Sequence, residues 1–232
     1  MSAAVAADAL AAMDWTALRV SFALAAATAA VLLPAGVAAA RVLAYGSFRG
    51  KPVVEALLAL PLVLPPTVLG YYLLVAMGAA SPLGAAYARL TGQPLAFSFQ
   101  GLLVASVVSN VPFALMPMQR AFESIPAEVR QAAACCGLSP ARALWRVELP
   151  LAWPGIASGL VMTLAHTVGE FGVVLMVGGS IPGETRTASI AIYDRVQAFD
   201  LRGADAMSAL LLALSLATLA LTNRLGRRAG GR

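Results

Sequence analysis

Long apolar runs alternate with short polar intervals along the chain. Each run is long enough for a helix that crosses a bilayer, which takes roughly 20 apolar residues. Inside lipid the backbone must satisfy its hydrogen bonds within its own helices. We therefore predict an all-α polytopic membrane protein, with a single transmembrane domain over residues 1–232. The expected spans are residues 15–40, 53–79, 96–119, 151–178 and 204–222.

The composition fits a lipid environment and the charges indicate a topology. Of the 232 residues 60% are hydrophobic and 12% charged, which excludes an ordinary water-soluble domain. The net charge of +5 forms no basic patch, so membrane lipid is expected around the chain and no nucleic acid. With the N-terminus outside and the C-terminus in the cytoplasm, as the positive-inside rule favours, the only basic residues left outside are Arg19, Arg89, Arg186, Arg195 and Arg202.

Prolines interrupt the second run. Pro61, Pro65 and Pro66 cannot lie in an unbroken helix, and the last two lie about 18 Å into the run at ~1.5 Å per residue. A break at this depth, followed by Thr67, either lines an aqueous path or only shapes helix packing. Both interpretations stay open from the sequence.

Polar side chains are also present in the third and fourth runs. Asn110 lies in the third run, and the fourth contains Thr163, His166, Thr167 and Glu170. His166 and Glu170 are four residues apart, and therefore on one face of a helix. These groups are candidates for a pathway or gate, or for hydrogen bonds between helices.

The polar interval 120–149 predicts two short helices joined by a tight turn. Gly137 suits the position after a helix C-terminus, Ser139 suits an N-cap and Pro140 suits the first helical position. Such a hairpin exposes the small apolar residues Ala132 and Ala133 and needs a partner surface. With the N-terminus outside, that partner is cytoplasmic.

The residues give no indication of an enzyme. The chain has one His and no nucleophile–base pair. Lys51 follows a glycine-containing segment that is one residue short of a phosphate loop and continues with proline. Cys135 and Cys136 are adjacent and lack metal-site spacing. We expect no catalytic residue, no metal and no cofactor on this chain.

A cytoplasmic signature indicates a family. Gln131-Ala132-Ala133, then Gly137, then Leu149-Pro150 resembles the Glu-Ala-Ala…Gly…Leu-Pro signature of binding-protein-dependent ABC permeases, with Gln131 in place of the usual Glu. The resemblance implies a type I ABC importer permease fold in a bacterial-type plasma (inner) membrane, and a coupling helix that docks on a dimer of separate ATPase subunits holding ATP and Mg. The implied coupling residues are Gln131, Ala132, Ala133, Gly137, Leu138, Ser139 and Pro140.

Further segments are similar to molybdate permeases, namely residues 60–70 (LPLVLPPTVLG), 169–172 (GEFG) and 181–187 (IPGETRT). They imply a pathway for molybdate delivered by an extracytoplasmic binding protein. Sulfate and thiosulfate permeases share the Glu-Phe-Gly element, and tungstate is chemically similar, so these anions are alternatives. The candidate pathway or gate residues are Pro65, Pro66, Thr67, Asn110, Thr163, His166, Thr167 and Glu170, and those of the outer loop are Pro182, Gly183, Glu184 and Arg186.

Charge and helix number restrict the mechanism. Glu170 would repel a dianion, which favours a structural or outer-gate role over direct binding. Five helices are too few to enclose a pathway with two access states, so a homodimer is expected. A secondary transporter is a weaker alternative, because five spans cannot form two equal repeats. The other alternative is a noncatalytic membrane scaffold that binds a cytoplasmic partner through the same hairpin.

Overall fold

The computed structural model describes residues 13–230, so both ends of the predicted domain 1–232 lie outside the described residues. The prediction of an all-α membrane fold is confirmed, and no strand occurs within residues 13–230. The helices are α2 (Trp15–Tyr45), α3 (Lys51–Val63), α4 (Pro66–Met77), α5 (Pro82–Thr91), α6 (Phe99–Glu123), α7 (Ala127–Cys135), α8 (Pro140–Ala143), the π-helical turn η1 (Leu144–Glu148), α9 (Leu149–Gly169), α10 (Gly172–Gly178), α11 (Ala188–Gln197) and α12 (Leu201–Gly230).

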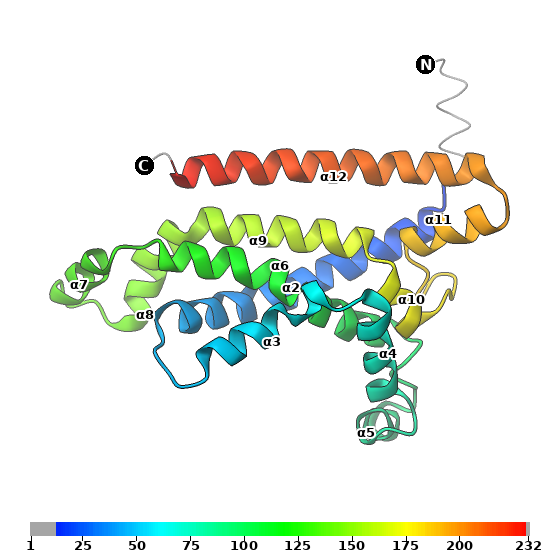
Figure 1. The fold of residues 1–232 in the computed structure, drawn as a ribbon, viewed down its shortest axis with the longest axis horizontal. Coiled ribbons are helices and arrows are strands. Elements are labelled where there is room, and N and C mark those ends of the chain that lie inside the picture. The colour runs from blue at the N-terminus through cyan, green and yellow to red at the C-terminus, as the bar shows by residue number, and fades with distance from the viewer. Residues whose placement is uncertain (1–12, 231–232) are drawn as a thin grey trace, which may run out of the picture.

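The second apolar run is a bent pair of helices. α3 ends before Leu64 and Pro65, and α4 starts at Pro66 after a bend of 111°. Prolines supply no N–H to an α-helical ladder, which explains the break at this place. Within the described residues, four other helices are long and apolar enough to cross a membrane, and the spans number up to five if the bent pair is counted as one. Figure 1 shows α2, α6, α9 and α12 running along the length of the molecule, with α4 turned away from the direction of α3.

The fourth apolar run differs from the prediction of one span over residues 151–178. An uninterrupted helical stretch runs from Pro140 through η1 to Gly169, and the chain then breaks at Glu170 and Phe171 before α10. The Glu170 carbonyl at the break has a partner outside α9, because Ser189 Oγ donates to it at 2.5 Å. The last part of the polar interval, from Pro140 on, and the fourth span are therefore one continuous helical unit.

The core lies where α2, α6 and α9 pack against one another. α6 and α9 approach closely at Gly159. A Cβ on this residue would lie only 2.7 Å from the carbonyl oxygen of Ala114. α3 and α12 lie on the outside: α3 buries no residue in the described structure, and 11% of the apolar window of α12 is buried. Such faces remain available to lipid or to a second chain.

Close packing of α6 on α9 gives a stability prediction. Gly159→Ala is expected to lower the free energy of unfolding by about 1–3 kcal/mol, as overpacking typically does, because the obstacle is backbone and cannot rotate away. Gly169→Ala in the same helix is the control, since its Cβ would meet nothing within 4 Å. Thermal unfolding of the detergent-solubilised variants measures the difference, and equal midpoints would contradict the packing.

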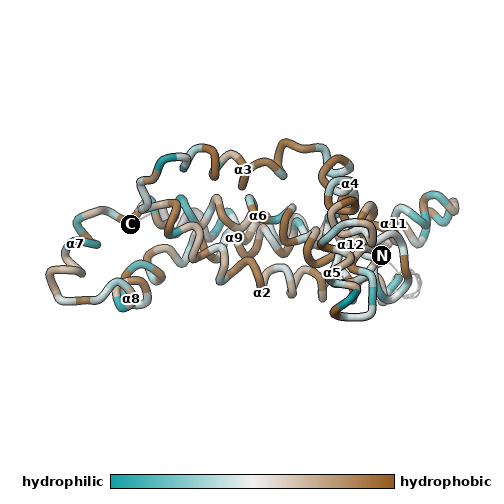
Figure 2. Tube along the Cα trace, turned by 90° about the horizontal axis from the view of Figure 1, so that it is seen from below, coloured by the Kyte–Doolittle hydropathy of each residue, from teal (hydrophilic) through white to brown (hydrophobic). Residues whose placement is uncertain are grey.

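The two ends of the molecule are different in character. α7 and α8 lie at one end, where α12 also finishes, whereas α2 begins at the opposite end beside α11 (Figure 1). The tube in Figure 2 is mostly brown along the long central helices and paler or teal around α7 and α8. We name the unit formed by α7, residues 136–139 and α8 the hairpin, and its end of the molecule the hairpin end.

Candidate functional site

A buried polar network lies where α2, α6 and α9 meet. Asn110 is fully buried, and its amide nitrogen lies 2.8 Å from the Ser106 carbonyl and 3.4 Å from Glu170 Oε2. His166 Nδ1 lies 3.0 Å from Asn110 Oδ1. Because an amide oxygen only accepts, Nδ1 is the donor in this contact. Thr28 of α2 donates to Ser106 Oγ at 3.0 Å, which connects all three helices.

The Asn110 amide therefore contacts both His166 and Glu170, the two ionisable residues that were predicted to lie on one face of a helix. The histidine ring is also fixed from its other side, because it stacks on Phe113 with a centroid distance of 3.9 Å. Glu170 is 7% exposed, and its Oε1 has no hydrogen-bond partner among the described residues. A buried, half-satisfied carboxylate is costly and is found mostly at positions with a function.

Other candidates from the fourth run lie outside this network. The hydroxyl of Thr163 donates to the Gly159 carbonyl and that of Thr167 to the Thr163 carbonyl, both at 2.8 Å and within α9. These hydroxyl hydrogens are engaged by the helix itself, so neither side chain offers a free donor in this structure. Both residues are buried, at 1% exposure each.

The two helix breaks lie against each other. A Cβ on Gly172 would lie 2.8 Å from Pro66 Cβ, so the start of α10 directly contacts the start of α4. Farther along, a Cβ on Gly70 would lie 2.7 Å from Met176 Cβ. Pro65, Pro66 and Thr67 themselves are exposed on the single chain. The break in the second span and the break at Glu170 and Phe171 thus form one site, which the polar network reaches through Glu170.

The outer-loop residues form an ordered turn. Arg186 pairs with Asp14, the N-cap of α2, at 2.8 Å. Thr185 is buried and its hydroxyl donates to the Gly178 carbonyl at 2.7 Å. Pro182, Gly183 and Glu184 are exposed. An open groove of about 400 Å³ runs beside them, lined by Thr16, Arg19, Val20, Ala23, Phe99, Gly183 and Glu184.

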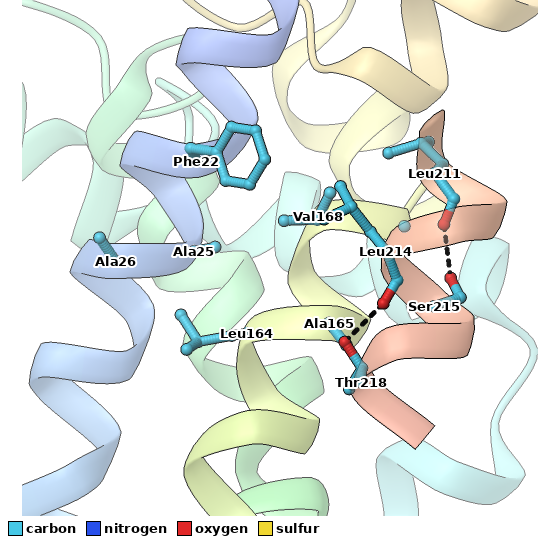
Figure 3. Close-up of a pocket in the computed structure, with 11 residues that line it drawn as sticks. Phe22, Ala25, Ala26, Leu164, Ala165, Val168, Leu211, Leu214, Ser215 and Thr218 are labelled. Atoms are coloured by element: carbon cyan, nitrogen blue, oxygen red, sulfur yellow. Dashed lines mark hydrogen bonds between the residues drawn. The ribbon is translucent and has the colours of Figure 1, made fainter. Parts of the chain in front are cut away.

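A larger groove lies between α2, α9 and α12 (Figure 3). Its volume is about 440 Å³ and its walls are mainly apolar, with Phe22, Leu164 and Leu214 among the lining residues. The hydroxyls of Ser215 and Thr218 donate to carbonyls of their own helix, shown as dashed lines in Figure 3. This groove therefore offers no free donor to an anion, and we do not place the site there.

The hairpin has the local chemistry that its sequence predicts. Gly137 has φ +74°, its N–H donates to the Ala134 carbonyl at 2.9 Å, and the Leu138 N–H donates to the Ala133 carbonyl at 3.1 Å. This pair of bonds is a Schellman motif. Ser139 caps α8 by accepting from the Arg142 N–H at 3.4 Å, and Pro140 is the first residue of that helix.

One detail of the hairpin differs from the expectation. Ala133 was expected to be exposed but is buried, at 7% exposure. Ala132 and Gln131 are exposed, as are Gly137, Ser139 and Pro140, and Leu138 is half-buried. Trp145, 72% exposed, adds a large apolar surface beside them. The hairpin thus presents a free face at the end of the molecule.

Two groups of interacting residues were not predicted from the sequence. Gln119 donates to Glu55 and to Glu123, both at 2.9 Å, in a groove between α3 and α6. Arg41 and Glu148 form an ion pair between α2 and the end of η1. Gln119 and Glu55 are 64 positions apart and Arg41 and Glu148 are 107 apart, so no local pattern predicts these two contacts, whereas Gln119 and Glu123 are four residues apart in α6. In the described residues, no three of His, Cys, Asp and Glu come together as a metal site.

Two facing helix breaks, a buried polar network and a free polar hairpin at one end define a membrane transport subunit. The chain matches the family described as "Binding-protein-dependent transport system inner membrane component" over residues 32–230 and belongs to it. It is accordingly a multi-span permease subunit of the inner membrane and not an enzyme.

Several proteins are similar over most of their length. "Molybdenum transport system permease protein ModB" of Azotobacter vinelandii is 45% identical over 187 residues, which cover 81% of this chain and 83% of that protein. The protein of the same name from Haemophilus influenzae is 34% identical and covers 93% and 95%. A crystal structure of a bacterial ABC transporter that imports the acidic polysaccharide alginate has a TM-score of 0.67 at 16% identity, over 92% of this chain and 78% of that one.

Proposed function

We propose that this chain forms the membrane pathway of an ATP-driven importer for molybdate. The observation that carries the proposal is the 45% identity, over four-fifths of the chain, with a protein named for molybdenum transport. Residues 60–70 and 169–172, which resemble molybdate permeases, form the two facing breaks. A probable sulfate permease of Chlorokybus atmophyticus is 32% identical over 181 residues, which makes sulfate the second candidate. Tungstate is chemically close to molybdate.

The proposed assembly contains two copies of this chain, two cytoplasmic ATPase subunits and an extracytoplasmic binding protein. One chain has five crossings and leaves α3 and α4 largely uncovered, so a two-fold partner would complete the pathway. A similar fold occurs in an alginate ABC transporter bound to its periplasmic protein. ATP and Mg belong on the ATPase subunits, which the hairpin would contact through Gln131, Ala132, Leu138 and Pro140.

The proposed orientation has the N-terminus outside and the hairpin in the cytoplasm. Arg120, Arg130, Arg142 and Arg146 surround the hairpin, and α12 also finishes at that end. This supports the positive-inside assignment. The ordered turn with Pro182, Gly183, Glu184 and Arg186 would then face the binding protein.

Within this assembly we assign the Asn110 network to an outer gate. Glu170 would repel a dianion that came close, and the single unpartnered oxygen is buried rather than open to a path. The network instead fixes the break after α9, which contacts the break before α4 through Gly172 and Pro66. Holding one break therefore positions the other, which is the requirement for a gate made of two helix ends.

Uptake of labelled molybdate tests this function. Cells without their own high-affinity system would carry this chain with the ATPase and binding protein encoded beside it. We expect ATP-dependent uptake that excess tungstate inhibits and excess sulfate does not. Inhibition by sulfate would assign the chain to sulfate transport instead. Absence of ATP-dependent uptake of either anion, with all three proteins present in the membrane fraction, would overturn the importer proposal.

A further inference from the structure

A bidentate ion pair joins the hairpin end of α2 to the start of α9. Arg41 Nε lies 2.5 Å from Glu148 Oε2, and its Nη2 lies 3.0 Å from Oε1. The Glu148 side chain is 5% exposed and that of Arg41 31%. Two parallel bonds from a guanidinium fix both the distance and the relative angle of the two helices.

Tyr45, one turn beyond Arg41, connects the same point to α6 and α7. Its hydroxyl donates to the Phe122 carbonyl at 3.2 Å, and its ring meets the Phe122 ring edge-on at 6.1 Å. The Arg130 guanidinium of α7 lies 4.0 Å from the centre of the Tyr45 ring, and that of Arg41 lies 5.8 Å from it. Cation–π contacts at these distances are attractive. We name Arg41, Tyr45, Arg130 and Glu148 the inner joint.

The inner joint lies where the hairpin connects to the spans. Glu148 is the last residue of η1, and a single π turn within a helix is a common site of local adjustment. Arg130 immediately precedes Gln131 and Ala132, which form the exposed face of α7. A displacement of the hairpin therefore reaches α9 through η1, and reaches α2 through the side chains of the inner joint as well as through the packing of α2 on α9.

We infer that Arg41 and Glu148 are positioning residues that transmit hairpin movement to α2 during ATP-driven transport. The inference rests on the proposed docking of the hairpin on the ATPase. α2 runs the full length of the molecule to the outer end, where its N-cap Asp14 holds Arg186 of the outer loop. A rigid helix fastened at both ends carries a displacement from one face of the membrane to the other.

The test uses the complete complex in proteoliposomes with Arg41→Met/Glu148→Leu. Replacing both members of a buried pair with apolar residues of similar size keeps a fold intact, whereas removal of one leaves a buried charge. We expect the ATPase to co-purify and ATP hydrolysis to stay within about twofold of the unaltered complex, while molybdate uptake per ATP falls about tenfold, a usual size for coupling between sites. The control is Arg195→Gln/Asp200→Asn, which removes the exposed ion pair before α12 and should leave the ratio unchanged.

Three outcomes overturn the inference. An unchanged ratio of uptake to ATP hydrolysis in the double variant would show that the ion pair only stabilises the fold. If the ATPase does not associate with the unaltered chain, the proposed docking is wrong, and the role proposed for the inner joint in transmitting movement is wrong with it. Arg41→Lys covers the case in which the double variant does not assemble: it keeps the charge but loses the bidentate geometry. Its ratio is expected to fall severalfold, and an unaltered ratio there also overturns the inference.

Discussion

Uptake of molybdate is expected to fall roughly a hundredfold when Asn110 is replaced by leucine. Leucine has the same branching and the same number of side-chain heavy atoms but cannot bond to His166 or to Glu170, whose shared partner is this one amide. A buried charged group that loses its partner costs about 3 kcal/mol, which corresponds to about a hundredfold in an equilibrium. The break after α9 would then lose its fixed position. Transport assays in proteoliposomes and thermal unfolding of the purified complex measure the two effects.

Thr163→Val is the matched control for Asn110→Leu. Thr163 is equally buried and lies one turn before His166, but its hydroxyl donates only within α9. We expect this variant to keep at least half of the uptake. Equal losses in the two variants would mean that any change in the packed region stops transport, and the outer-gate assignment would be withdrawn.

The second large effect is expected at Gly137. With φ +74°, a β-branched residue at this position strains the turn by about 1–3 kcal/mol. Gly137→Val should therefore displace α8 from α7 and weaken the contact with the ATPase by up to about a hundredfold. Co-purification of the ATPase and ATP-dependent uptake are the measurements. The open space around Gly137 means that strain, not collision, is the cause.

Gly92 supplies a control of equal strain. It has the same φ of +74°, it also follows a helix C-terminus, and a Cβ there would likewise meet nothing within 4 Å. It follows α5, at the end of the molecule away from the hairpin. Gly92→Val should lower stability to a similar extent and leave the ATPase bound. Loss of the ATPase from both variants would show that general destabilisation, and not the hairpin turn, is responsible.

Local chemistry made part of the fold predictable. The break at Pro65 and Pro66 follows from the missing N–H of proline, and the hairpin turn follows from Gly137 and Ser139, whose preferences are decided within a few residues. The break after Gly169 could not be predicted in this way. It depends on Asn110 and Ser189, which come from other helices, and on the space that Gly172 leaves for Pro66.

The candidate site was also only partly predictable from the sequence: its ionisable residues could be recognised, but their contacts between helices could not. His166 and Glu170 were recognisable as ionisable residues in an apolar run, because such residues are expensive in a membrane. Their joint dependence on Asn110 is a tertiary property. Arg41 and Glu148 are 107 positions apart, so no local sequence pattern predicts that they pair. Thr163 and Thr167 had the same polarity as the network residues, but the helix backbone engages their hydroxyls.

The contact between Pro66 and Gly172 also affects how the chain is made. α4 leaves the ribosome well before α10, and at 5–20 residues per second the intervening stretch takes about 5–20 seconds to synthesise. During that interval the bent second span lies in the translocon or the bilayer without α10, the helix that it packs against. Folding of this permease is therefore completed late, because a chain that stops before α10 carries a proline-broken span without the helix that it packs against.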